Sequence, residues 1–165
     1  MAVLPDHALL ALGETLCTPF LPELVNPASI DVRLGFKICT ETVDGNFDQD
    51  YINPMLGYDL APGEFILAET LEYVRIPPDI AAFFSLKSSR AREGLQHLMA
   101  GFVDPGWNGR LTLELHNSLQ HSSILLVPEM RIGQLVLHRL ESEPLKDYSQ
   151  TGRYQGAVQV EESKG

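Results

Sequence analysis

Apolar and polar residues alternate along much of this chain. The clearest run covers residues 30–38, where every second side chain is apolar. A period of two predicts a half-buried β-strand. Shorter strand-like runs follow at 64–68, 73–76, 81–86, 111–115, 124–127 and 132–140. The join at 69–72 is only a weak break, so the first two of these runs could also form one bent strand.

Helix and turn signals are fewer. Residues 6–12 predict one short helix, with Asp6 as its N-cap and Gly13 ending it. Residues 42–62 are rich in Asp, Asn, Gly and Pro, which predicts an irregular excursion. Many short strands with one small helix are typical of an all-β sandwich, jelly roll or barrel.

Length and charge narrow the class of protein. The chain has 165 residues, which suggests one domain, and a net charge of −10, which argues against nucleic acid as a partner. One cationic cluster stands out against this acidic background, formed by Lys87, Arg90 and Arg92. No apolar run approaches the ~18 residues of a membrane span, and no signal peptide is recognisable. We therefore expect a cytoplasmic protein without a membrane partner.

Zinc chemistry is not expected. Cys17 and Cys39 fit no metal-site spacing, the five histidines show no ligand pattern, and a Cys-x-x-Cys pair is absent. Walker and Gly-x-Ser-x-Gly motifs are absent too. Two free thiols are the favoured interpretation of the cysteines, although a disulfide remains open.

A basic segment at 86–94 is the first candidate site. Ser88 heads a helix-compatible run, and the free N–H groups of a helix N-terminus suit phosphate oxygens. Ser88 and Arg92 are four residues apart and would share a face, with Lys87 beside them, whereas Arg90 would point elsewhere. The alternative is a solvated basic turn with a serine N-cap, which the segment on its own favours.

Two further segments carry candidate acidic groups. In the glycine-rich run 100–109, Asp104 could bind a sugar hydroxyl or orient a water, although a turn-forming role is the simpler interpretation; Trp107 is expected in the core. In 111–115 the leucines share one strand face, and Thr112 and Glu114 share the other. In a pocket, Glu114 would have a raised pKa suited to proton transfer. The pattern alone favours a solvent-facing glutamate.

Together these segments resemble the dCTP deaminase family of the dUTPase superfamily, including its bifunctional dCTP deaminase/dUTPase branch. Residues 87–92 are similar to the family's phosphate-binding motif, 100–109 to its sugar-binding turn, and 112–114 to the strand with its catalytic glutamate. Segments 27–35, 62–65 and 131–135 also fit, and the motif order holds from about residue 4 to residue 156.

This resemblance implies one domain, 1–165, with a dUTPase-like distorted jelly roll or β-barrel and one or two short helices. It implies a homotrimer with active sites between subunits, and a flexible lid over 146–165. The implied reaction, in pyrimidine deoxynucleotide metabolism, is hydrolysis of dCTP to dUTP, with or without onward hydrolysis to dUMP and diphosphate. Magnesium would accompany the triphosphate, no metal would be bound by the protein alone, and dTTP is a candidate inhibitor.

The resemblance also implies residue roles. Glu114 would take a proton from the water that attacks cytosine C4, and Arg92, Ser88 and Asp104 would complete the catalytic set. The substrate-binding set would be Lys87, Ser88, Ser89, Arg90, Ala91, Arg92, Asp104, Thr112, Leu113, Glu114, Gln134, Tyr148, Arg153, Tyr154 and Gln155.

Three positions depart from the family pattern. Met99 stands where relatives usually have threonine, Arg90 replaces a usual leucine, and Ala157 follows the Arg-Tyr-Gln-Gly run where many relatives have glutamine. Two alternatives stay open: a dUTPase only, and a non-catalytic nucleotide-binding relative. The first is weakened by Lys-Ser-Ser in place of Arg-Ser-Gly and by the absence of a C-terminal glycine-rich motif.

Overall fold

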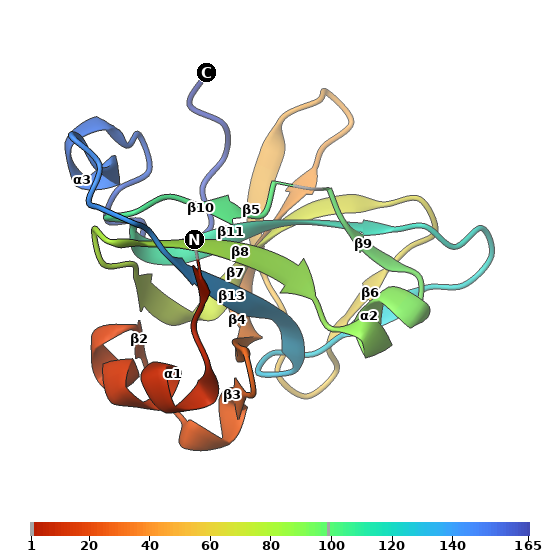
Figure 1. The fold of residues 1–165 in the computed structure, drawn as a ribbon. Coiled ribbons are helices and arrows are strands. Elements are labelled where there is room, and N and C mark those ends of the chain that lie inside the picture. The colour runs from red at the N-terminus through yellow and green to blue at the C-terminus, as the bar shows by residue number, and fades with distance from the viewer. Residues whose placement is uncertain (1, 99) are drawn as a thin grey trace.

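The computed structural model describes residues 2–98 and 100–165, and strands dominate it (Figure 1). Within these residues, no helix is long and apolar enough to cross a membrane. In chain order the elements are β1 (Ala2–Val3), α1 (Asp6–Leu12), the 3-10 turn η1 (Gly13–Thr15), β2 (Cys17–Thr18), the 3-10 turn η2 (Pro22–Leu24), β3 (Val25–Asn26), β4 (Ser29–Glu41), β5 (Phe47–Tyr51), β6 (Tyr58–Leu60), β7 (Phe65–Arg75), β8 (Ile80–Leu86), α2 (Ser88–Arg92), β9 (Leu95–His97), β10 (Phe102–Val103), β11 (Asn108–Asn117), β12 (Ile124–Leu126), β13 (Arg131–Arg139) and α3 (Tyr148–Thr151).

One long strand joins two halves of a curled sheet. The sheet runs β10-β8-β13-β4-β7-β11-β9, and β6 and β12 form a separate pair. The first part of β4 pairs with β3 and β13, and its second part pairs with β5 and β7. The register with β7 is irregular between Leu34 and Ile38, where the strand passes from one half to the other. The all-β prediction is confirmed.

The core lies inside this curled sheet, and β4 is buried more completely than its alternation suggested. Leu34 and Ile38 are fully buried, as the pattern predicts, but Asp31 and Gly35 on the polar face are buried as well. The half-buried prediction for 30–38 is therefore wrong at these positions, because later parts of the chain cover the second face. Cys17 and Cys39 are both buried free thiols, which is the favoured interpretation of the two cysteines.

The runs at 64–68 and 73–76 belong to the single strand β7, with a bulge opposite its centre. The Thr70 hydroxyl donates to the carbonyl of Glu72 and accepts from the amide of Leu111. The pairing with β11 shifts between Arg110 and Thr112 at this point. A threonine side chain thus replaces a ladder hydrogen bond, so the strand bends without ending.

A buried ion pair stabilises the junction of β4 and β7. Glu72 is fully buried, and its two oxygens accept from Arg33 Nε at 2.7 Å and from the Arg33 amide at 2.8 Å. Both carboxylate oxygens are therefore satisfied, which a buried charge requires.

Two local predictions need correction. Helix α1 has Pro5 at the N-cap position and no side-chain cap bond, so Asp6 is the first helical residue. Residues 42–62 contain two strands, β5 on β4 and β6 on β12. Strand β5 is an edge strand with mostly exposed side chains, which explains why its sequence is polar and resembles a loop. Three short α-helices are present in the described residues, one more than expected.

Candidate active site

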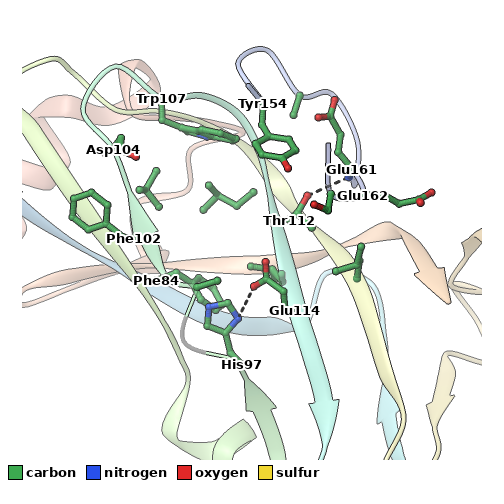
Figure 2. A pocket seen from close by; sticks show the side chains of 18 of the residues that line it. Phe84, His97, Phe102, Asp104, Trp107, Thr112, Glu114, Tyr154, Glu161 and Glu162 are labelled. Atoms are coloured by element: carbon green, nitrogen blue, oxygen red, sulfur yellow. Dashed lines mark hydrogen bonds and ion pairs between the residues drawn. The ribbon is translucent and has the colours of Figure 1, made fainter. Parts of the chain in front are cut away.

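A cavity of about 560 Å³ lies between β11, the 100–107 segment and the C-terminal segment (Figure 2). Its walls are mainly aromatic and aliphatic, and four of its polar side chains are carboxylates. The lining residues that carry acidic or titratable side chains are His97, Asp104, Glu114, Tyr148, Tyr154, Glu161 and Glu162. A mainly apolar lining with several placed polar side chains is typical of a small-molecule site.

Strand alternation places Glu114 in this cavity. Leu115 points into the core, while Thr112 and Glu114 face the cavity from β11; Leu113 is buried in the core and also borders the cavity. The Glu114 side chain is 26% exposed, and burial raises the pKa of its carboxyl. Glu114 therefore lines a pocket and is not the solvent-facing glutamate that the pattern favoured.

His97 lies beside this glutamate, brought there by the pairing of β9 with β11. Its Nδ1 is 3.6 Å from Glu114 Oε2, and its ring packs edge-on against Phe84 at 4.6 Å (Figure 2). Burial lowers the pKa of His97, so the neutral imidazole is favoured. The sequence alone does not point to this residue, because its contact with Glu114 depends on the non-local pairing of β9 with β11.

Asp104 begins the turn at the other end of the cavity. Its carbonyl accepts from the amide of Trp107, and its side chain is exposed and lines the cavity. The turn is braced by α3: the Tyr148 amide donates to the Pro105 carbonyl, and the Tyr148 ring lies 5.2 Å from Trp107. Trp107 is buried, as expected, and also forms part of the cavity wall.

The C-terminal segment closes one side of the cavity. Gln155 bridges the turn, accepting from the Asn108 amide and donating to the Gly106 carbonyl. Further on, the Glu161 amide donates to the Thr112 hydroxyl at 3.2 Å. Tyr154, Glu161 and Glu162 line the cavity from this segment, as Figure 2 shows. The two glutamates were not predicted as part of the site, and only the fold reveals them.

The predicted phosphate segment lies elsewhere. Helix α2 is at the opposite side of the molecule from α3 in Figure 1, and none of residues 87–92 lines the cavity. Ser88, Ser89 and Arg92 are exposed. Lys87, not Ser88, occupies the N-cap position, and no side chain caps the helix, so the serine N-cap prediction is wrong.

Other predicted residues have partners of their own. Arg90 pairs with Glu93 at 2.7 Å, one turn along the short helix. Lys87 Nζ donates to Asp31 at 2.8 Å, and Gln134 Oε1 accepts from the Ser29 hydroxyl at 3.0 Å. Arg153 is exposed and contributes its carbonyl to Lys164 Nζ. Met99 lies outside the described residues.

A protein-family model described as dCTP deaminase-like matches residues 4–140. The chain is 38% identical to a dCTP deaminase, dUMP-forming, from Methanopyrus kandleri over 186 residues, covering 99% of this chain and 96% of that protein. It is 41% identical to the protein of the same name from Thermobifida fusca, covering 91% of this chain and 84% of the relative. The chain belongs to the dCTP deaminase-like family.

A solved structure supports the fold of this dCTP deaminase-like chain. The crystal structure of 2'-deoxycytidine 5'-triphosphate deaminase from Agrobacterium tumefaciens superposes with a TM-score of 0.70 at 20% identity. The match covers 87% of this chain, which spans half the length of that structure. The predicted β-rich fold is thereby confirmed by its likeness to a solved dCTP deaminase structure.

In a single chain of this dCTP deaminase-like protein, the predicted site is divided. The cavity brings together Asp104, Thr112, Leu113, Glu114, Tyr148 and Tyr154. It does not include Lys87, Ser88, Ser89, Arg90, Ala91, Arg92, Gln134, Arg153 or Gln155. Among the described residues, no group of three or more His, Cys, Asp or Glu side chains is placed to hold a metal ion.

Proposed function

We propose that this protein hydrolyses dCTP to dUTP and ammonia and carries dUTP on to dUMP and diphosphate. The observation that carries the proposal is Glu114, a half-buried carboxyl of raised pKa in an aromatic-walled cavity. The family and the name dCTP deaminase, dUMP-forming, of its relatives support the choice of reaction.

For deamination, Glu114 takes a proton from a water molecule, and the resulting hydroxide attacks C4 of cytosine. The same carboxyl then delivers the proton to ring N3 and assists the departure of the amine as ammonia. A carboxyl in both roles needs a pKa near the working pH, and partial burial moves the pKa of Glu114 in that direction. Neutral His97 beside it adds no positive charge that would lower this pKa.

For the second step, a water beside Asp104 attacks the α-phosphorus of dUTP, and diphosphate leaves. Asp104 is an exposed carboxylate that lines the cavity, and it also suits the deoxyribose hydroxyl. Magnesium would arrive bound to the triphosphate and spread its developing charge. The dUTP-hydrolysing half of the proposal rests mainly on the relatives' names.

The active form we propose is a homotrimer whose sites lie between subunits. No lysine or arginine lines the cavity among the described residues, whereas four carboxylates do: Asp104, Glu114, Glu161 and Glu162. A triphosphate needs cations, so the cavity of one chain is incomplete. The exposed Ser88, Ser89 and Arg92 of a second copy would supply the missing phosphate-binding groups.

The test is a product analysis with magnesium and either dCTP or dUTP, resolved by ion-exchange chromatography, with Glu114→Gln alongside. The proposal expects dCTP to become dUMP, diphosphate and ammonia, and expects the mutant to lose deamination. If dUTP accumulates, the protein is a deaminase alone. Cleavage of dUTP with dCTP untouched would make it a dUTPase, and nucleotide binding without turnover would make it a non-catalytic relative. A stable monomer by light scattering under turnover conditions would overturn the shared site.

A further inference from the structure

A fully buried carboxylate lies behind the predicted phosphate segment. The Asp31 side chain on β4 has no exposed surface. Its Oδ1 accepts from Lys87 Nζ at 2.8 Å and from Asn26 Nδ2 at 2.7 Å. Its Oδ2 has no hydrogen-bond partner among the described residues and lies 3.5 Å from Arg131 Nη1. One carboxylate therefore faces two cationic side chains, one from each oxygen.

The sheet fixes this arrangement. Strand β13 lies between β8 and β4, with Gly133 opposite Leu86 on one side and Val32 on the other. Lys87 directly follows β8 and Arg131 opens β13, so both cations lie at the same end of these two paired strands, beside Asp31 of β4. Lys87 is 26% exposed and Arg131 is 51% exposed, while Asp31 is shielded from water. The two cationic side chains of this cluster are therefore accessible to solvent, whereas its carboxylate is buried.

A second pair repeats this arrangement one step along β4. Ser29 is two residues before Asp31 and so lies on the same strand face. Its hydroxyl donates to Gln134 Oε1, which leaves the Gln134 amide N–H groups free to donate. Each of these β4 side chains is therefore hydrogen-bonded to a predicted ligand residue: Ser29 to Gln134, and Asp31 to Lys87.

We propose that Arg131 is a further anion-binding residue beside Lys87, and that Asp31 is the positioning residue that orients both cations. The ligand class is the polyphosphate part of the nucleotide, so this inference rests on the proposed function. A carboxylate that only neutralised the cluster would weaken anion binding, because it cancels positive charge. A carboxylate that positions the cations strengthens anion binding, because ordered donors lose less side-chain entropy on binding. The two roles predict opposite effects of removing its charge.

The experiment measures the binding of inorganic tripolyphosphate and the kcat and KM for dCTP. The variants are Arg131→Gln and Asp31→Asn. Matched controls are Arg139→Gln and Asp79→Asn, an exposed ion pair at the far end of β13 with the same charge changes. Arg131→Gln should weaken tripolyphosphate binding about tenfold, as expected for one charge-assisted hydrogen bond. Asp31→Asn should also weaken it, although the variant makes the protein less acidic. For dCTP, KM should rise with little change in kcat.

Two results would overturn the inference: tighter tripolyphosphate binding by Asp31→Asn, or Arg131→Gln behaving like Arg139→Gln. Arg131→Lys, which retains the charge, should recover part of the affinity. If Asp31→Asn fails to fold, as judged by thermal unfolding, the test of anion binding rests on the variants of the exposed Arg131. A wild-type protein that neither binds tripolyphosphate nor turns over dCTP would refute the proposed function itself. A wild type that does both, with unchanged variants, refutes only this inference.

Discussion

His97 Nδ1 and Glu114 Oε2 lie 3.6 Å apart, and neither atom has a hydrogen-bond partner within the described residues. The separation is beyond the usual hydrogen-bond range. Burial lowers the pKa of the histidine and raises that of the glutamate, so both shifts disfavour the charged pair. A strong ion pair would hold Glu114 ionised at low pH and weaken it as a base; this geometry avoids that.

The first prediction concerns the pH dependence of deamination. Glu114 must be ionised to take a proton from water, so kcat should fall as the pH drops through its pKa. Because burial raises that pKa, the midpoint should lie above the ~4.3 of an ordinary glutamate. A pH–rate profile for dCTP, with circular dichroism at each pH to verify folding, measures it. An acid limb at or below the ordinary value would indicate a well-solvated Glu114.

The same shift predicts how Glu114→Gln changes stability. A carboxyl with a raised folded-state pKa contributes stability that is present below its unfolded pKa and lost as pH rises through its folded pKa. As pH rises across this window, the free energy of unfolding of the wild type should therefore fall relative to that of the mutant, which lacks the titrating carboxyl. Urea denaturation at matched protein concentration and several pH values tests it. Glu93→Gln, at an exposed position, is the control.

How far the sequence anticipates this fold depends on the range of the interactions. The strands 30–38, 81–86, 111–115 and 132–140 were predicted correctly, because alternation is a local pattern. The edge strand β5 was missed, since its exposed side chains leave no apolar period. The sequence did not decide whether 64–68 and 73–76 form one strand or two, because the bulge of β7 includes a hydrogen bond to Leu111 of another strand.

In the candidate site too, local patterns could be predicted from the sequence and non-local contacts could not. Glu114 could be named from the motif order, but its burial required knowledge of what covers β11. His97, Glu161 and Glu162 were not predicted, since they reach the cavity through strand pairing and the return of the C-terminal segment. The positioning of Lys87 by Asp31 was equally hidden, because the two residues are 56 positions apart.

The third prediction tests the buried ion pair between β4 and β7. Glu72→Gln removes the buried counter-charge of the Arg33 guanidinium, whose side chain is 13% exposed, and leaves only the exposed Glu129 carboxylate at 3.8 Å. The free energy of unfolding should fall by about 3 kcal/mol or more. Asp79→Asn, which removes the partner of Arg139 in an exposed pair, should cost less than about 1 kcal/mol. Equal effects in urea denaturation would contradict the buried geometry.

The fourth prediction compares two valines in the C-terminal segment. Val160 is 1% exposed and packs with Cys39 and Leu67, whereas Val158 is 69% exposed. Val160→Ala should weaken the docking of residues 157–163 by about 1–2 kcal/mol and speed their amide hydrogen exchange correspondingly. Val158→Ala should leave the exchange unchanged. Similar exchange in both variants would mean that this segment does not dock through Val160.

The fifth prediction concerns the two buried thiols. Burial raises the pKa of Cys17 to about 12, and it raises that of Cys39 as well. Because the thiolate is the reactive form, neither cysteine should react with a disulfide reagent at pH 8 until the protein unfolds. Both should then react at once in denaturant. Rapid labelling of the native protein, or no labelling after unfolding, would contradict the two buried free thiols.

The C-terminal segment is fastened at both ends and in its middle. Near one end the Tyr148 amide donates to the Pro105 carbonyl, and near the other Val160 is buried against Cys39 of β4 and Leu67 of β7. Between these contacts, the Gly156 amide donates to the Asn108 carbonyl, and the Ala157 carbonyl accepts from the Arg110 amide. This side of the cavity is therefore a fixed wall, and opening it would require several of these contacts to break together.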